Sequence, residues 1–320
     1  MEKVKNTIKN YKLFKDDTPL MLMVSGGSDS VALVKIMQEI HDGPLAIMHL
    51  NHMLRDDDSK KDEKFVKNLG LKTFIYRQDL KKINGNVEAN GRKLRYRYAR
   101  KAVKEWGYEN AVIATAHTVN DRVENFYMRS IVGTGPGGFT SISYKNRDIV
   151  RPLLDCSREE LQNYLCNIGQ TWRVDKTNND TDRFRAYVRH KIVPLAIEQN
   201  PKLLGTLSNT MNLISDENDY LEKIVEANLN TIDLNNNSCL FKPEFNNLDT
   251  VIKRRIIYKV LRHLLPEEER IETKSIKSIL QACKINNYTD NIQYNYAVHS
   301  NKHGVLVEPM QSYRLKRNRI

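Results

Sequence analysis

The apolar positions in the first half of the chain form two alternating kinds of segment. Short apolar runs such as 20–24 are typical of strands buried in a sheet, whereas apolar residues three and four positions apart are typical of helices packed against it. The pattern predicts strands at 20–25, 44–50, 73–76, 111–116 and 149–151, and helices at 30–40, 59–69, 87–106, 119–132 and 157–168. This alternation predicts an α/β fold, a parallel sheet with helices on both faces.

The alternation ends near Asn200 and Pro201. Helical patterns then follow near 201–229, 247–265 and 271–285, and a pair of strands is predicted within 292–307. We therefore expect two domains, 1–200 and 201–320, of which the second is mainly helical.

The charge balance adds a hint about the partner. Lys and Arg number 51 against 39 Asp and Glu, which gives a formal net charge of +12. This excess fits a polyanionic partner, and a general basic bias of the source proteins is the alternative. No apolar run approaches a membrane span and no signal peptide opens the chain, so we expect a cytoplasmic protein without a membrane partner. Sulfur-transfer chemistry is disfavoured because the four cysteines lack metal-binding spacing.

The segment between the first predicted strand and helix reads Ser-Gly-Gly-Ser-Asp-Ser. Its glycines allow a tight turn that brings backbone N–H groups and a helix N-terminus close to an anion. It matches neither a Walker loop nor a dinucleotide motif, and a plain turn is the alternative. A carboxylate near phosphate suggests an intervening Mg²⁺, so Asp29 is the expected metal ligand. The predicted anion-binding residues are Ser25, Gly26, Gly27, Ser28, Asp29 and Ser30.

The helix predicted at 87–106 carries a row of cations on one arc of about 100°. They are Lys93, Arg97, Arg100, Lys101 and Lys104. A solvated surface is the ordinary interpretation, but no acid is interleaved on the arc, which favours a phosphate backbone as partner. Arg92 and Arg95 lie on the apolar side near Glu88, so each is either paired there or faces a ligand.

Two carboxylates follow the strand predicted at 111–116. Asp121 and Glu124 are three residues apart and share a face at the start of a helix. They are either partners of the helix dipole or ligands of a cation, which would be Mg²⁺ or an ammonium substrate. The four glycines within 133–138 indicate a linker or a mobile loop beside the site, and we favour the loop.

Together these segments resemble the tRNA(Ile)-lysidine synthetases, a family of ATP pyrophosphatases. Five motifs carry the resemblance: 25–30; 49–55; Glu88 with Arg92, Arg95 and Tyr96; 114–117 with Asp121, Glu124, the glycine loop and Phe139; and 151–154 with Asp175 and Asn178. The region 247–307 is similar to the first C-terminal domain of that family, and we expect no second one. The chain departs from the family pattern at Gly91, Asn125, Ala186 and Tyr187.

The resemblance implies an adenine nucleotide α-hydrolase-like fold and a ligase that uses ATP and Mg²⁺. Its substrates would be free L-lysine and tRNA(Ile) with a CAU anticodon. ATP would adenylate the C2 oxygen of the wobble cytidine with release of pyrophosphate, and the lysine ε-amine would then displace AMP.

The resemblance also implies roles for individual residues. Implied catalytic residues are Asp29, Arg92, Asp121, Glu124 and Asn178, and His52 and Arg55 would join residues 25–30 in binding the nucleotide. Asp121, Glu124, Arg185, Arg189 and the five cations of 87–106 would contact lysine or tRNA. A homodimer is left open. The alternatives are a related ATP pyrophosphatase that modifies another base, or a non-catalytic RNA-binding homologue.

Overall fold

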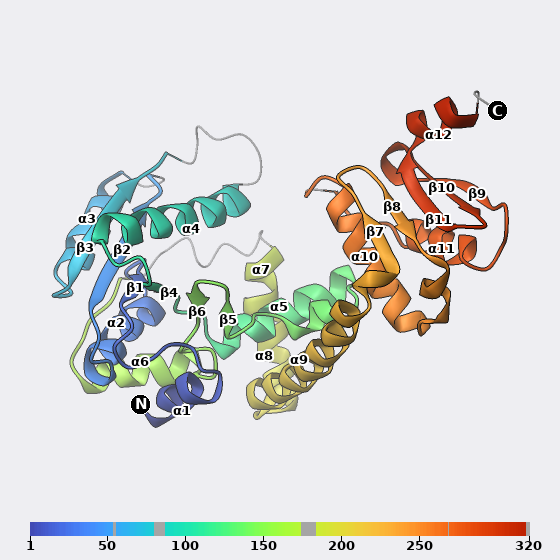
Figure 1. Cartoon of the computed structure of the whole chain (residues 1–320). Helices are drawn as coiled ribbons and strands as arrows, with labels where there is room; N and C mark the ends of the chain where they lie inside the picture. Colours follow the sequence, from blue (N-terminus) through green and yellow to red (C-terminus); the bar gives the residue numbers. More distant parts are fainter. Residues whose placement is uncertain (54–55, 80–86, 174–183, 268, 318–320) are drawn as a thin grey trace. The chain divides into compact units, whose positions relative to one another are not determined.

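The computed structural model describes residues 1–53, 56–79, 87–173, 184–267 and 269–317 (Figure 1). Contacts within the chain divide it into two units, Met1–Ser215 and Asp216–Ile320. The division falls inside a long helix, α9 (Leu203–Ala227), rather than at Pro201. The assignment of separate functions to two domains stays a prediction.

The first unit is built on a six-stranded sheet in the order β3-β2-β1-β4-β6-β5. Its five parallel strands match the five predicted ones: β1 (Leu20–Met23), β2 (Leu45–Asn51), β3 (Lys72–Arg77), β4 (Val112–Ala114) and β6 (Ile149–Val150). The additional strand β5 (Lys145–Asn146) runs antiparallel to β6. The central position of β1 places the segment that follows it at the middle of the carboxyl edge of the sheet, where ligands of such folds bind.

Helices cover both faces of this sheet, as the pattern predicted (Figure 1). Leu20 and Leu22 of β1 pack in one core with residues of α2, while Met21 packs in the other with Ala99 and Ala102 of α4. Alternate residues of a strand point to opposite faces, so β1 is apolar throughout. The helices of this part are α1 (Glu2–Asn10), α2 (Ser28–Ile40), α3 (Asp56–Lys67), α4 (Val87–Trp106), α5 (Val119–Val132) and α6 (Arg158–Asn167).

A short helical segment, whose basic start at 183–190 the sequence predicted as a helix, also belongs to the first unit. It comprises α7 (Phe184–Tyr187), a π-helical turn (Val188–Ile192) and α8 (Val193–Gln199). Val188 packs with Val123 of α5 and Met211 of α9 in a small core. This packing holds one side of the segment against α5.

The second unit combines helices with a five-stranded antiparallel sheet in the order β7-β8-β11-β10-β9. The predicted pair of strands corresponds to β10 (Tyr296–Asn301) and β11 (Gly304–Pro309), whereas β7 (Ile232–Leu234), β8 (Cys239–Phe241) and β9 (Thr289–Ile292) were not predicted. Gly304 has φ +126° and lies too close to the carbonyl of Phe241 for any side chain.

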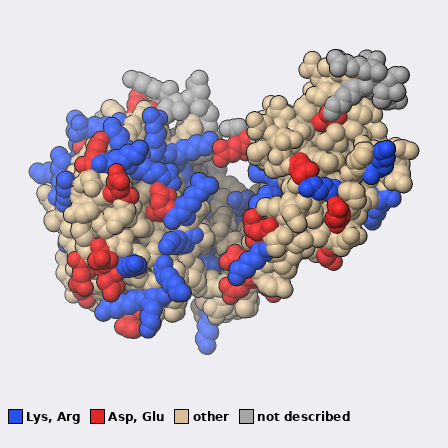
Figure 2. All heavy atoms as spheres, viewed as in Figure 1, with Lys and Arg blue, Asp and Glu red and all other residues tan. Residues whose placement is uncertain are grey.

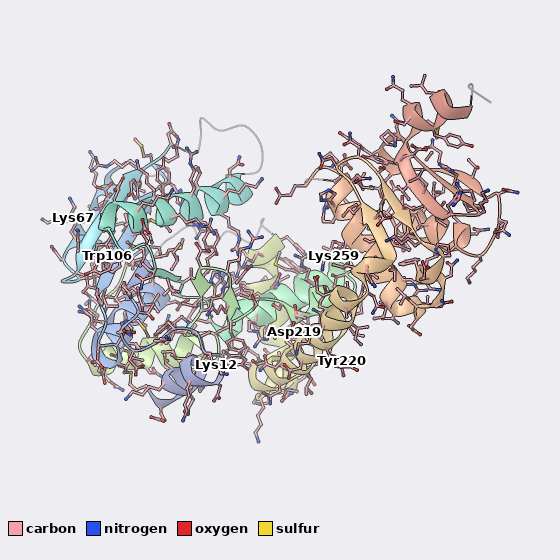
Figure 3. The ribbon with its side chains drawn as sticks, viewed as in Figure 1. Lys12, Lys67, Trp106, Asp219, Tyr220 and Lys259 are labelled. Carbon is pink, nitrogen blue, oxygen red and sulfur yellow. The ribbon has the colours of Figure 1, made fainter. Side chains whose placement is uncertain are left out.

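Three helices pack around this sheet or extend from it: α10 (Thr250–Leu264), α11 (Thr273–Ala282) and α12 (Met310–Arg317). Ion pairs join α10 to the last turns of α9. Arg255 lies 2.9 Å from Glu222, and Lys259, labelled in Figure 3, contacts Glu222 and Glu226. In the described ranges of the chain, no helix combines the length and the apolar character needed to cross a bilayer.

Candidate active site

The loop between β1 and α2 makes the tight turn that its glycines predicted. Gly26 has φ +97°, and Gly27 is the N-cap of α2. The Ser30 hydroxyl accepts from the Gly26 N–H at 3.1 Å and donates to the Gly27 carbonyl at 2.9 Å, so it holds the loop closed. The first N–H groups of α2 have no partner within the helix, which suits them to an anion. That they bind phosphate stays a prediction.

Arg173 supports this loop and was not predicted. Its backbone N–H donates to the Gly26 carbonyl at 2.9 Å, and its guanidinium donates to Asp62 of α3 at 2.8 Å. Nothing in the sequence around Arg173 indicates these contacts, because they depend on segments far apart in the chain.

The Asp121 and Glu124 side chains lie close enough for one guanidinium to contact both, in keeping with the shared helix face that their spacing predicted. Arg185 donates to Asp121 at 2.9 Å and to Glu124 at 3.0 Å. Arg189 forms a bidentate pair with Glu124 at 2.6 and 3.0 Å. Asp121 also accepts from the Thr118 N–H at 2.8 Å and so caps the start of α5, which agrees with the alternative of a carboxylate at the positive end of the helix dipole. The cations that contact Asp121 and Glu124 in this structure are therefore arginines of the chain itself.

A third arginine, Arg158, joins this pair to the glycine-containing loop. Its guanidinium lies 3.2 Å from Asp29, 3.5 Å from Asp121 and 3.7 Å from Glu124. Its backbone N–H donates to the Asn120 side chain at 2.9 Å, which ties α6 to the start of α5. Arg158 was not predicted as a site residue from the sequence. The available signal was its position as the first residue of α6, where the helix dipole disfavours a cation unless a carboxylate compensates it.

Burial sets the electrostatics of the cluster. Glu124 is only 1% exposed and Asp121 8%. Burial raises the pKa of Asp29, and the Arg158 charge is the strongest influence opposing that rise. For Asp121 burial also acts to raise the pKa, but the Arg185 charge foremost, with Arg158 and the Thr118 N–H, holds it below its usual range. Because the carboxylates lie among guanidinium groups, the cluster is close to electrically balanced.

Two histidines of the predicted site, His117 and His52, are neutral at pH 7. Burial lowers the pKa of His117 to about 3, and Thr115 Oγ1 contacts its Nδ1 at 2.8 Å. Burial, followed by the Arg95 charge, lowers the pKa of His52 to about 4. Its Nδ1 is buried and has no hydrogen-bond partner among the described residues, which fits the predicted contact with a nucleotide. Arg55, Asp175 and Asn178 lie outside the described residues.

Arg92 is exposed, although its position on the apolar side of α4 suggested burial. Its guanidinium lies over the Tyr96 ring, 5.2 Å from the centroid, and its charge lowers the pKa of His117 less than burial and the Arg151 charge do. The predicted pair with Glu88 lies outside the described side chains. A role for Arg92 in a reaction stays a prediction.

The cationic arc of α4 is real, but the expectation that all five cations are unpaired was wrong. Arg100 makes a bidentate pair with Asp148 at 2.8 and 3.0 Å, because the loop before β6 brings an acid to the helix. Lys101 lies 3.7 Å from Glu105 on the next turn. The remaining three cations are exposed and form no ion pair with the described residues: Lys93, Arg97 and Lys104. Figure 2 shows Lys and Arg side chains gathered over α4.

The donor set around Asp29 fits one kind of magnesium site. The described residues include no group of three or more His, Cys, Asp or Glu that could hold a metal ion. Mg²⁺ in phosphate-transfer sites is often held by one or two carboxylates together with substrate phosphates. Asp29, at the N-terminus of α2, fits that arrangement and not an all-protein cage.

The glycine-containing loop and its sheet match a known family of domains. Residues 1–196 match the family model described as a PP-loop domain. A solved structure with a similar fold is the U34-tRNA thiolase NcsA from Methanococcus maripaludis with its [4Fe-4S] cluster. It has a TM-score of 0.52 and 16% identity, and the match covers 67% of this chain and 78% of that one. This similarity concerns the fold alone.

Curated relatives match a longer part of the chain. It is 30% identical over 295 residues to the tRNA(Ile)-lysidine synthase of Caldanaerobacter subterraneus subsp. tengcongensis, a match covering 88% of this chain. It is 32% identical over 293 residues to the tRNA(Ile)-lysidine synthase of Clostridium acetobutylicum, covering 86% of this chain. In both cases the chain spans 62% of the relative's length.

Proposed function

Because the chain belongs to the family of PP-loop domains, we propose that it is a tRNA-modifying ligase that uses ATP to join lysine to the wobble cytidine of a tRNA(Ile) with a CAU anticodon. The relatives named tRNA(Ile)-lysidine synthase support this choice of reaction. The observation that carries the proposal is the position of Arg158. Its guanidinium joins Asp29, the carboxylate of the loop at 25–30 (the PP-loop below), to the buried Asp121 and Glu124. The proposed polyphosphate site would thus adjoin the proposed ammonium site.

In the first step of this reaction, the C2 oxygen of the cytidine attacks the α-phosphorus of ATP and pyrophosphate leaves. The first N–H groups of α2 would bind the phosphates, with the helix dipole adding to the attraction. Asp29, together with phosphate oxygens, would hold Mg²⁺, which would neutralise phosphate charge. The cytidine must leave its stack to reach the nucleotide.

In the second step, the lysine ε-ammonium loses a proton to solvent, the free amine forms a bond to C2, and AMP leaves with the oxygen that C2 carried while the bonded nitrogen gives up a second proton to solvent. Asp121 and Glu124 would position the amine through charge-assisted hydrogen bonds. The exposed cations of α4 would bind the tRNA backbone. A cytoplasmic location follows from the substrates proposed, and a homodimer stays a prediction that sedimentation of the purified chain would check.

The test is incubation of the protein with ATP, labelled lysine and total tRNA. We expect the label to enter the tRNA fraction only when ATP is present, with one AMP and one pyrophosphate released for each lysine joined. A transcript with uridine at the wobble position is the control and should accept no lysine. ATP cleavage without attached lysine would indicate modification of another base, and tRNA binding without ATP cleavage would indicate a non-catalytic protein.

A second measurement tests the amine site. Asp121→Asn and Glu124→Gln should each raise the KM for lysine about tenfold or more, with a smaller change in the KM for ATP, because a charge-assisted hydrogen bond contributes roughly 1.5–3 kcal/mol. A change confined to the ATP or Mg²⁺ dependence would make the pair a metal site and reject the assignment to lysine.

A further inference from the structure

The six side chains of the cluster form a charge-balanced set. Three carboxylates face three guanidinium groups: Asp29, Asp121 and Glu124 against Arg158, Arg185 and Arg189. His117 adds no charge at neutral pH, because burial lowers its pKa to about 3. In this state the carboxylates already have cationic partners, so an ammonium ligand must replace one of them.

Arg158 is the cation held by the longest contacts. Its distances to the carboxylates run from 3.2 to 3.7 Å, whereas Arg185 and Arg189 each approach Glu124 to 3.0 Å or less. Arg158 also differs in its neighbours, because it contacts Asp29 of the PP-loop as well as Asp121 and Glu124, called the acid pair below. A polyphosphate bound at that loop would lie beside this guanidinium and compete with the carboxylates for it.

The third cationic contact of Asp121 and Glu124 depends on Arg158. If Arg158 turns to the phosphate and Asp29 holds Mg²⁺ as proposed above, Asp121 and Glu124 keep Arg185 and Arg189 but lose the guanidinium that lies 3.5 and 3.7 Å from them. Two buried carboxylates then have room for another cation beside them. An ammonium group can take the place that Arg158 leaves, and lysine brings one on its side chain.

We infer that Arg158 couples the two substrate sites: it neutralises the carboxylates in the free protein and exchanges them for phosphate when nucleotide binds, which opens the acid pair to lysine. This inference rests on the proposed function. It assigns a role to a residue outside the sequence motifs, and it predicts that nucleotide promotes lysine binding. Because coupling between sites is reciprocal, lysine must tighten nucleotide binding by the same factor.

The experiment is equilibrium dialysis of labelled lysine against the full chain with Mg²⁺, in the presence and absence of α,β-methylene-ATP, which cannot release pyrophosphate. We expect the analogue to tighten lysine binding about tenfold or more in the wild type. In Arg158→Gln, lysine should bind without the analogue about as tightly as the wild type does with it, and the analogue should change the affinity less than twofold. Pyrophosphate alone is a second probe and should act in the same direction as the analogue.

Two variants make the test decisive. Arg158→Lys keeps a cation and should keep a clear dependence on nucleotide, and it replaces Arg158→Gln as the test if the latter does not fold. Lys3→Gln removes an exposed cation that pairs with Glu160 on the same helix as Arg158, and it should behave as the wild type. Retention of the full nucleotide dependence in Arg158→Gln, or its loss in Arg158→Lys, would overturn the inference.

The other outcomes separate this inference from the proposed function. Lysine that becomes attached to tRNA but binds the wild type equally with and without nucleotide overturns the inference alone. Absence of lysine binding in every state, with normal binding of the analogue, overturns the proposed function too. If Arg158→Gln tightens Mg²⁺ binding and leaves lysine binding unchanged, the carboxylates that Arg158 contacts bind a metal ion and not lysine, and the inference is wrong.

Discussion

The first unit holds two groups of cationic side chains, and they differ in burial and in whether they contact a carboxylate. Around Asp121 and Glu124, each arginine is a third exposed or less and contacts a buried carboxylate. On α4, the side chain of Arg100 is 49% exposed and bonds an acid that is 35% exposed, while Lys93, Arg97 and Lys104 are exposed without an ion pair among the described residues. The same residue types therefore fix a geometry in one region and leave charge available to a large anion in the other.

The strongest test of this contrast removes the carboxylate at the PP-loop. Asp29→Ala should keep the fold but lower pyrophosphate release about a thousandfold, because the charge stabilisation that a metal supplies is several kcal/mol. Pyrophosphate release at saturating Mg²⁺ is the measurement, with Lys3→Gln as the control. Turnover of Asp29→Ala near the wild-type rate would reject the metal role.

The second test compares a buried ion pair with an exposed one in the same unit. Glu124→Gln should lower the free energy of unfolding by about 3 kcal/mol, because the buried carboxylate that bonds Arg189 at 2.6 and 3.0 Å is lost and Arg185 keeps only Asp121. Lys3→Gln, whose pair is 48% and 50% exposed, should cost less than about 1 kcal/mol. Both tryptophans, Trp106 and Trp172, lie in the first unit, so fluorescence during urea unfolding reports on it. Equal losses would mean that burial does not distinguish the two pairs.

The third test asks which cations of α4 are available to tRNA. Arg97→Gln combined with Lys104→Gln should weaken tRNA binding about tenfold and reduce the slope of log affinity against log salt by somewhat under one unit per lost contact. Arg100→Gln should change the slope little, because Asp148 already binds that guanidinium. Turnover at saturating tRNA should stay near wild type in all of them. An unchanged slope in the double variant would mean that this face is only solvated.

The smallest effect concerns the exposed pair of Arg100 and Asp148. The hydrogen bond from Arg100 is the main cause that lowers the pKa of Asp148. The pair therefore stabilises the fold above the ordinary carboxyl pKa of about 4, and this contribution is lost as the pH falls through the lowered pKa of Asp148. Asp148→Asn should therefore cost about 0.5 kcal/mol at pH 7, less at pH 3, and nearly nothing in 1 M salt. Urea unfolding under the three conditions measures it. A loss that grows toward low pH would contradict this account.

The sequence by itself determined the features that depend on near neighbours. The apolar runs predicted the five parallel strands, because a strand buried on both faces must be apolar throughout. The glycines of the PP-loop predicted the turn that Gly26 makes at φ +97°, a conformation that other residues rarely adopt. The spacing of Asp121 and Glu124 placed both on one face of a helix.

Only the tertiary structure decided which charges meet. Arg158 lies 129 positions from Asp29 in the sequence, and Arg185 and Arg189 lie more than 60 positions from Glu124, on a basic helix whose partners its own pattern does not show. Asp148 likewise reaches Arg100 from a separate loop. A carboxylate carries the same sequence signal whether it is free to bind a substrate or already paired. The difference depends on burial and on partners distant in the chain, and these are fixed only when the sheet and its helices pack together.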